Sequence, residues 1–132
     1  MIRIAVCDDE NVIVNQIEHI ISEVCKRESI PVNIDVFYSG RELKRQVTSG
    51  TKYDIIFLDI QMKGGDGITA AENIRKVDDN VLLIYVSGYD KYMMELFRLD
   101  VFGFIKKPID EEILTKTFLE TYQSCLLYTS PS

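Results

Sequence analysis

The order of apolar and polar residues along this chain switches repeatedly between strand-like and helix-like patterns. Runs rich in β-branched and aliphatic residues predict strands at residues 2–7, 32–37, 54–59, 81–86 and 103–106. Apolar positions three and four residues apart predict helices at residues 11–28, 43–47, 71–77, 91–99 and 110–122. Strands and helices therefore alternate, which predicts five β-α units in succession.

The fold class follows from this alternation. Residues 54–59 and 81–86 are almost continuously apolar, which is typical of strands buried on both faces of a parallel sheet. Alternating strands and helices imply a doubly wound α/β domain with right-handed crossovers and with helices on both faces of the sheet. Because residues 126–132 lack apolar periodicity, we assign the domain to residues 1–125 and interpret the remainder as a disordered tail or an artificial extension.

The length of 132 residues suits one domain, and the formal net charge of −6 narrows the range of partners. A nucleic-acid-binding surface needs clustered Lys and Arg, so direct binding of nucleic acid by this domain is not expected. The longest useful apolar run, residues 81–86, is far shorter than the roughly 18 residues of a membrane-spanning helix, so no membrane association is expected. The apolar N-terminus is too short for a signal peptide, and the three cysteines form no Cys-x-x-Cys pair, which favours a cytoplasmic protein.

In open parallel sheets ligands bind outside the carboxyl ends of the strands, so the residues that follow each predicted strand are informative. These residues are Asp8, Asp9, Asp59, Ser87 and Lys107. The three carboxylates would repel one another unless a cation lies among them or one of them stays protonated. A hard divalent ion that prefers oxygen ligands, Mg²⁺, resolves that conflict.

Five short motifs carry a resemblance to a known family: Asp8-Asp9, Phe57-Leu58-Asp59, Gly65-Asp66-Gly67, Ser87-Gly88 and Lys107-Pro108. In this order, and placed after the predicted strands, they resemble the receiver domain of two-component response regulators, the CheY-like family. The resemblance extends from Ile2 to about Tyr122. It implies a flavodoxin-like sheet of five parallel strands in the order 2-1-3-4-5.

The resemblance also implies the roles of the site residues. Asp59 would be the nucleophile that accepts a phosphoryl group from a sensor histidine kinase. Asp9, Asp59 and the main-chain carbonyl of Gln61 would bind Mg²⁺, while Asp8 would act through a water molecule. Lys107 would supply a further positive charge to the phosphoryl oxygens. Such a domain catalyses only its own phosphorylation and dephosphorylation, and is not an enzyme acting on other substrates.

A conformational switch is implied as well. Ser87 would donate a hydrogen bond to a phosphoryl oxygen, and its movement would open space that Phe104 can occupy. The helix 91–99, the strand 103–106 and the last helix would then form the signalling face. The helix 91–99 carries more apolar residues than one core-facing stripe requires, which is compatible with a homodimer surface and equally with a well-buried helix.

Two segments, residues 57–62 and 102–109, resemble receivers that precede a LytTR-type DNA-binding domain. The chain ends soon after the last predicted helix, so either this is a single-domain regulator or an output domain that controls transcription is missing from this chain. Two departures from the family pattern stand out. Met62-Lys63 replaces the usual Met-Pro pair, and Phe104 replaces the usual Tyr, which keeps the bulk but loses the hydroxyl.

Each motif also has a structural alternative. The acids that begin at Asp8 suit the first turn of a helix, Ser87 suits a helix N-cap, and Lys107 could form a solvated pair before a turn. Their occurrence together favours the functional interpretation. The acidic run would repel the phosphate of a flavin cofactor, and a phosphatase of the haloacid dehalogenase type would need Asp where Gln61 stands. A receiver that is never phosphorylated and acts as a protein-interaction module is the remaining alternative.

Overall fold

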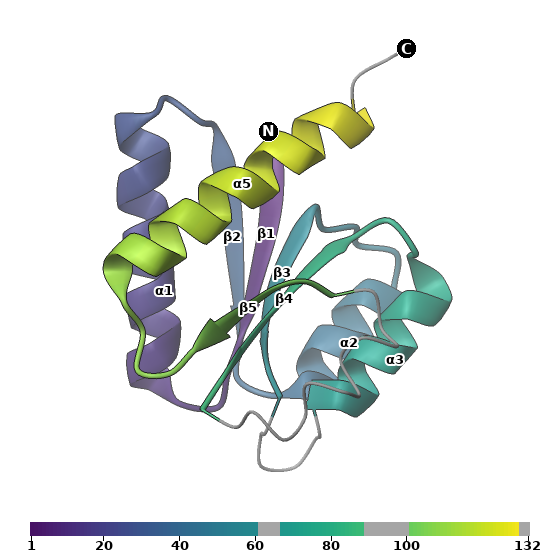
Figure 1. The fold of residues 1–132 in the computed structure, drawn as a ribbon. Helices are drawn as coiled ribbons and strands as arrows, with labels where there is room; N and C mark the ends of the chain where they lie inside the picture. The colour runs from purple at the N-terminus through teal and green to yellow at the C-terminus, as the bar shows by residue number, and fades with distance from the viewer. Residues whose placement is uncertain (61–66, 89–100, 130–132) are drawn as a thin grey trace.

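The computed structural model describes residues 1–60, 67–88 and 101–129, without the side chains of the last two. These residues form an α/β domain in which the next described element after every strand but the fourth is a helix (Figure 1). The strands are β1 (Ile2–Cys7), β2 (Val32–Phe37), β3 (Ile55–Asp59), β4 (Leu82–Ser87) and β5 (Val101–Lys106). The helices within the described ranges are α1 (Asn11–Arg27), α2 (Gly40–Thr48), α3 (Gly67–Val77) and α5 (Glu111–Thr129).

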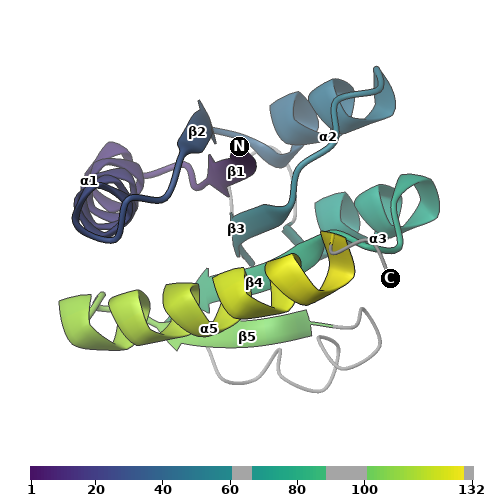
Figure 2. The same cartoon turned by 90° about the horizontal axis from the view of Figure 1, so that it is seen from above.

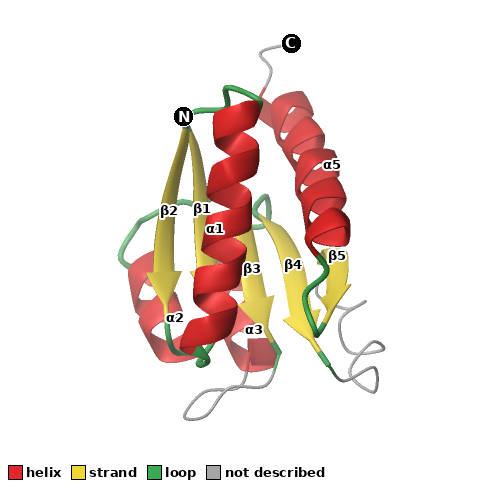
Figure 3. Ribbon diagram, turned by 90° about the vertical axis from the view of Figure 1, so that its left-hand side faces the viewer, coloured by secondary structure: helices red, strands yellow, loops and turns green. Residues whose placement is uncertain are grey.

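The five strands form one parallel sheet in the order β2-β1-β3-β4-β5, which confirms the predicted topology. All strands run in the same direction, so their carboxyl ends lie together at one edge, and the N-terminus and the end of α5 lie toward the opposite edge (Figure 3). The register pairs Asp59 with Val86 and Ser87 with Lys106. The ends of β3, β4 and β5 are therefore level with one another.

Helices cover both faces of the sheet, as the alternating pattern predicts (Figure 2). On one face α1 and α5 pack against alternate strand residues such as Ile55 and Phe57. On the other face α2 and α3 pack against the intervening residues, such as Ile56 and Leu58. Successive side chains of a strand point to opposite faces of the sheet. Because helices cover both faces, every residue of β3 is buried. The two apolar cores thus hold the central strands rigidly up to their carboxyl ends.

Two of the described helices, α2 and α5, begin where a side chain accepts hydrogen bonds from their first N–H groups. Ser39 caps α2, since its hydroxyl accepts a hydrogen bond from the main-chain N–H of Glu42 at 3.2 Å. The Asp110 carboxylate accepts hydrogen bonds from the main-chain N–H groups of Glu112 at 2.9 Å and Ile113 at 3.2 Å. Asp110 thereby fixes the start of α5 directly after the residues that close β5.

Several element boundaries differ from those predicted: α2 begins three residues and α3 four residues before the predicted helix, and two further differences have a local cause. β5 begins at Val101, two residues before the predicted strand. The prediction missed Val101 and Phe102 because Gly103 interrupts the apolar pattern and weakens the strand signal. α5 continues to Thr129, into the segment for which no regular structure was predicted. Thr121 and Cys125, one helical turn apart, are both buried, whereas Leu127 is 80% exposed and breaks the apolar periodicity.

Other predictions concern residues outside the described ranges. The helix at 91–99 and the loop around Gly65 belong to this group. Among the described helices, none combines the length and the apolar character that would let it cross a lipid bilayer.

Candidate functional site

The carboxyl edge of the sheet brings together the polar residues that the sequence places after its strands. Asp8 and Asp9 directly follow β1, Asp59 ends β3 and Ser87 ends β4. Lys107 follows β5, and its main-chain N–H donates a hydrogen bond to the Ser87 carbonyl at 3.0 Å, which holds the end of β5 beside that of β4. The topology thus brings five residues from four separate segments of the sequence to one edge of the sheet.

Three carboxylates of this edge form a tight cluster. One carboxylate oxygen each of Asp8, Asp9 and Asp59 lies within 4.8 Å of the others. Asp8 is 1% and Asp59 4% exposed, while Asp9 is half-buried. Buried acids without compensation are rare, because both burial and a neighbouring like charge disfavour the ionised form. The cluster therefore calls for positive charge.

Lys107 supplies part of that charge. Its Nζ lies 2.9 Å from Asp8 Oδ2, 3.5 Å from Asp59 Oδ2 and 3.9 Å from Oε2 of the exposed Glu10. Burial lowers the pKa of Lys107, but the hydrogen bond to Asp8 and the charges of Asp59, Asp8 and Glu10 outweigh burial and raise it above its ordinary value. Lys107 is therefore an ammonium at neutral pH and bridges two strand ends.

One ammonium does not fully compensate the cluster. Burial raises the pKa of Asp8 above its ordinary value, although the main-chain N–H of Glu10, at 2.9 Å from Asp8 Oδ1, and the ammonium of Lys107 both act to lower it. The net upward direction means that the ionised form of Asp8 is less favourable here than in water. An additional cation among these oxygens would relieve that cost.

The donor set fits a hard divalent cation. The clustered ligand atoms are all carboxylate oxygens, which are the ligands that Mg²⁺ prefers. The nearby Cys7 adds no thiolate, because burial and the charges of Asp8 and Asp59 raise the pKa of its thiol. Its Sγ instead donates a hydrogen bond to the Ser39 carbonyl at 3.3 Å. The predicted carbonyl ligand, Gln61, lies outside the described residues.

The two predicted switch residues lie on adjacent strands. Ser87 is 1% exposed at the end of β4, and Phe104 on β5 is half-buried and packs against the core of the α2–α3 face. The register places Tyr85, not Ser87, directly beside Phe104. Ser87 is thus a diagonal neighbour of Phe104. The sequence analysis treated Tyr85 only as part of an apolar strand, and only the strand register reveals its proximity to Phe104.

Glu10 and Gly67 are two further residues that the sequence analysis left without a role. Glu10 was part of the acidic run, and its side chain faces the ammonium of Lys107. Gly67 was part of a family motif, and it begins α3 in contact with the main chain after Asp59. A run of three acids, or a glycine at the start of a helix, does not by itself predict a role at the site. Neither feature shows which residue of another element it will contact.

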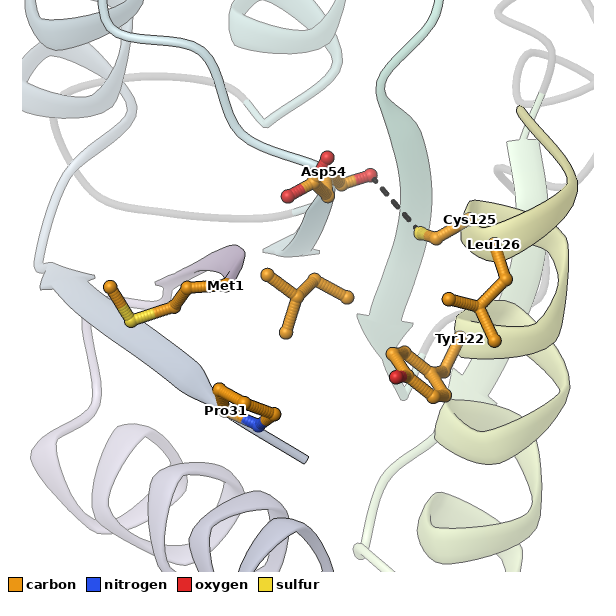
Figure 4. A pocket seen from close by; sticks show the side chains of 7 residues that line it. Met1, Pro31, Asp54, Tyr122, Cys125 and Leu126 are labelled. Carbon is orange, nitrogen blue, oxygen red and sulfur yellow. Dashed lines mark hydrogen bonds between the residues drawn. The ribbon is translucent and has the colours of Figure 1, made fainter. Parts of the chain in front are cut away.

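A cavity of about 240 Å³ lies at the opposite, amino edge of the sheet (Figure 4). Asp54 lines it, but the carboxylate of Asp54 already accepts a hydrogen bond from the main-chain N–H of Arg3 at 2.8 Å. Figure 4 shows the thiol of Cys125 directed at the Asp54 carbonyl, with Sγ 3.9 Å from that oxygen. Tyr122 contributes a largely apolar wall. No cluster of acids converges here among the described residues.

Comparison with known proteins decides the family. The family model named response regulator receiver domain matches residues 4–119, which include every clustered residue of the carboxyl edge. The chain belongs to the response regulator receiver domain family. This result confirms the resemblance drawn from the five motifs.

Individual relatives of this receiver agree with the family assignment. The sensory transduction protein LytT of Bacillus anthracis is 28% identical over 117 residues, which cover 89% of this chain and 46% of LytT. The solved receiver domain of AraT, a response regulator from Geobacillus stearothermophilus, has a TM-score of 0.82 at 25% identity and covers 97% of this chain and 98% of the AraT domain. The response regulatory domain of mrkE from Klebsiella pneumoniae has a TM-score of 0.85 at 20% identity, covering 96% of this chain and 99% of that domain.

The relatives named LytT and LytR also agree with the predicted likeness to LytTR-type regulators. The chain spans less than half the length of these curated relatives, between 40% and 46% of each. The receiver therefore corresponds to one part of a longer protein in each of them. Receiver domains of response regulators are signalling domains and not enzymes of the usual kind.

Proposed function

We propose that this receiver takes a phosphoryl group from a sensor histidine kinase onto Asp59, with Mg²⁺ bound by the neighbouring carboxylates. The convergence of Asp8, Asp9, Asp59 and Lys107 at the carboxyl edge of the sheet is the observation that supports this proposal most strongly. Nothing about folding requires an acid at the end of the fully buried strand β3, whereas a phosphoryl acceptor does.

The transfer step is a displacement at phosphorus. A carboxylate oxygen of Asp59 attacks the phosphorus of a phosphohistidine, so that a P–O bond forms and the P–N bond breaks. The electron pair of that bond stays on the imidazole nitrogen of the donor. The ammonium of Lys107, 3.5 Å from Asp59 Oδ2, stabilises the negative charge on the phosphoryl oxygens.

The metal site follows from the same cluster. Asp9, Asp59 and the main-chain carbonyl of Gln61 would hold Mg²⁺, and Asp8 would act through a water molecule; Asp8 Oδ2 also lies 2.9 Å from the ammonium of Lys107. When bound, Mg²⁺ neutralises charge on the transferring phosphoryl oxygens. Asp8 thus has a second task in this proposal, which is to orient the ammonium toward the acceptor.

Phosphorylation then changes the packing at β4 and β5. The hydroxyl of Ser87 donates a hydrogen bond to a phosphoryl oxygen, and Phe104 moves into the space that Ser87 leaves. Residues 91–99, which lie outside the described ranges, would form the responding face together with β5 and α5, through homodimer formation or through an output domain that binds DNA. The relative from Escherichia coli named transcriptional regulatory protein YpdB, 24% identical over 113 residues, supports a transcriptional output.

Mass spectrometry tests the acceptor. Incubation with Mg²⁺ and acetyl phosphate should add the mass of one phosphoryl group to the unchanged protein, and Asp59→Asn should abolish the gain. Asp54→Asn is a matched control, since Asp54 precedes the strand that Asp59 ends, and this variant should still be labelled. Equal labelling of Asp59→Asn and the unchanged protein would rule out Asp59. A complete lack of labelling in the unchanged protein would favour an interaction module that is never phosphorylated.

A separate experiment tests the switch. Beryllofluoride with Mg²⁺ should shift amide NMR signals across residues 89–107, and Ser87→Ala should confine the shifts to the loops around the acids. Shifts confined to those loops in the unchanged protein would remove Phe104 from the mechanism.

A further inference from the structure

The contact between the start of α3 and the end of β3 is unusually close. Gly67, the first residue of α3, is buried, and its main-chain N–H donates a hydrogen bond to the Ile60 carbonyl at 2.9 Å. A β-carbon on Gly67 would overlap the carbonyl oxygen of Asp59 and the main chain of Ile60. These are main-chain atoms, so no side-chain rotation could make room for them.

This contact fixes the main chain of the acceptor from the side that the sheet leaves open. Asp59 pairs with Val86 on β4 through the sheet, and it is the last residue of its strand. Beyond Asp59 the sheet no longer holds the chain. The hydrogen bond from Gly67 to Ile60 and the close approach of Gly67 to the Asp59 carbonyl replace that support.

We propose that Gly67 is a positioning residue that sets where the Asp59 carboxylate lies relative to Asp9 and Lys107. This inference rests on the proposed function, because it concerns the placement of the phosphoryl acceptor. Gly67 touches neither the phosphoryl group nor the metal. It acts through the peptide after Asp59, and it allows α3 to come closer to that peptide than any residue with a side chain would.

Two other glycines near the carboxyl half of the described sheet do not share this geometry. A β-carbon on Gly88, at the same edge of the sheet, would meet only Lys107 Cβ at 4.0 Å, which is ordinary van der Waals contact. A β-carbon on Gly103 would lie 3.3 Å from the Thr117 side chain, which belongs to the α5 face. The steric requirement at Gly67 is therefore specific to the acceptor peptide.

The test compares three variants in the acetyl phosphate assay. Gly67→Ala should slow phosphorylation at saturating Mg²⁺ and acetyl phosphate by about 10- to 100-fold, since a misplacement of about 1 Å can cost about that much. It should also weaken Mg²⁺ binding in calorimetry. Gly88→Ala adds the same methyl group at the same edge and should keep a rate close to that of the unchanged protein. Ile74→Ala removes a buried side chain of α3 and should lower stability without slowing the reaction of the folded protein.

Two results would overturn the proposal. One is a Gly67→Ala protein that is folded and reacts as fast as Gly88→Ala. The other is an Ile74→Ala protein that loses rate and Mg²⁺ affinity as strongly as Gly67→Ala, since a merely structural role of α3 would then explain both.

A measurement on the unchanged protein applies if Gly67→Ala does not fold. The Gly67 amide should stay protected from hydrogen exchange when Mg²⁺ and beryllofluoride are added, because the Gly67–Ile60 hydrogen bond is the support. Loss of that protection would contradict the positioning role. If the unchanged protein were not phosphorylated at all, the proposed function would fail, whereas Mg²⁺ affinity and amide protection would still report on Gly67.

Discussion

The two edges of the sheet treat their carboxylates in opposite ways. On the amino side, Asp35 in the middle of β2 accepts a hydrogen bond from the hydroxyl of Tyr53, which precedes β3, at 2.7 Å. Asp35 also lies 3.8 Å from the Arg3 guanidinium, with 36% of its side chain exposed. The Arg3 guanidinium in turn lies over the Tyr53 ring, 5.6 Å from its centroid. Asp54 accepts from the Arg3 main chain. Each of these two acids has its own donor and is only partly buried.

At the carboxyl edge the acids converge and are buried. Asp8 and Asp59 approach the same ammonium, and Asp9 lies beside them. Such an arrangement costs stability in the absence of a further cation, because like charges share a dry site. We infer that the amino edge is arranged for folding, and that the carboxyl edge is arranged for the metal binding and phosphoryl transfer proposed above. Four changes to the protein or to the pH test this contrast.

Removal of the ammonium should have the largest effect. Lys107→Met leaves Asp8, 1% exposed, without its ion-pair partner, so the free energy of unfolding without Mg²⁺ should fall by about 2–3 kcal/mol. Phosphorylation should also be lost. Arg3→Met removes a 44% exposed cation at the amino edge and should cost about 1 kcal/mol or less. Urea denaturation measures both, and equal losses would contradict the contrast between the edges.

Removal of one clustered carboxylate should change the free energy of unfolding in the opposite direction. Asp9→Asn relieves repulsion, so the free energy of unfolding without Mg²⁺ should rise by about 1 kcal/mol. The stabilisation by Mg²⁺, about 2.7 kcal/mol at 100 times the dissociation constant in the unchanged protein, should largely disappear. Asp35→Asn should keep the full Mg²⁺ response. An unaltered Mg²⁺ response in Asp9→Asn would remove Asp9 from the metal site.

The amino edge should show its arrangement at high pH. Burial, the hydrogen bond to Asp35 and the charge of Asp35 raise the pKa of Tyr53 well above its ordinary value of 10.0. The folded state therefore holds the phenol proton more tightly, so this stabilisation is complete below pH 10 and is lost as the pH rises further. At about half a pH unit above 10, the free energy of unfolding should have fallen by about 1 kcal/mol. Above pH 10 the free energy of unfolding, measured by denaturation, should fall more steeply with pH in the unchanged protein than in Tyr53→Phe. Identical slopes in the two proteins would refute the interpretation.

The smallest effect is expected from the end of the chain. We propose residues 1–125 as the receiver unit, with the remainder outside it. Removal of residues 126–132 takes away the 80% exposed Leu127 and none of the residues of the carboxyl edge. Labelling by acetyl phosphate should stay unchanged, and a clear loss of labelling would place the tail within the functional unit.

Much of the fold could be predicted because its signals are local. Continuous apolar runs predict the strands that are buried on both faces, and the burial of every residue from Ile55 to Asp59 agrees with that prediction. The order of the strands came from a family resemblance. The end of α5 could not be predicted, since Leu127 is exposed and the helix there continues without an apolar period.

The sequence predicts that four of the candidate residues meet at one edge of the sheet, and the structure brings them together there, but their geometry could not be predicted. Asp8, Asp9, Asp59 and Lys107 follow strands in the sequence, and parallel topology alone brings them to one edge. The distances within the cluster depend on strand register, which one sequence does not reveal. The proximity of Tyr85 to Phe104 and the contact of Gly67 with the acceptor peptide have the same origin, because both depend on how separate elements pack.

A crystal structure of this protein with Mg²⁺ and beryllofluoride tests the central claim most directly. The account predicts a beryllofluoride group bonded to a carboxylate oxygen of Asp59, with Mg²⁺ coordinated by Asp9 and Asp59 and with the Lys107 ammonium on a fluoride. Beryllofluoride and Mg²⁺ absent from the carboxyl edge at saturating concentrations, or bound there without Asp59, would contradict it.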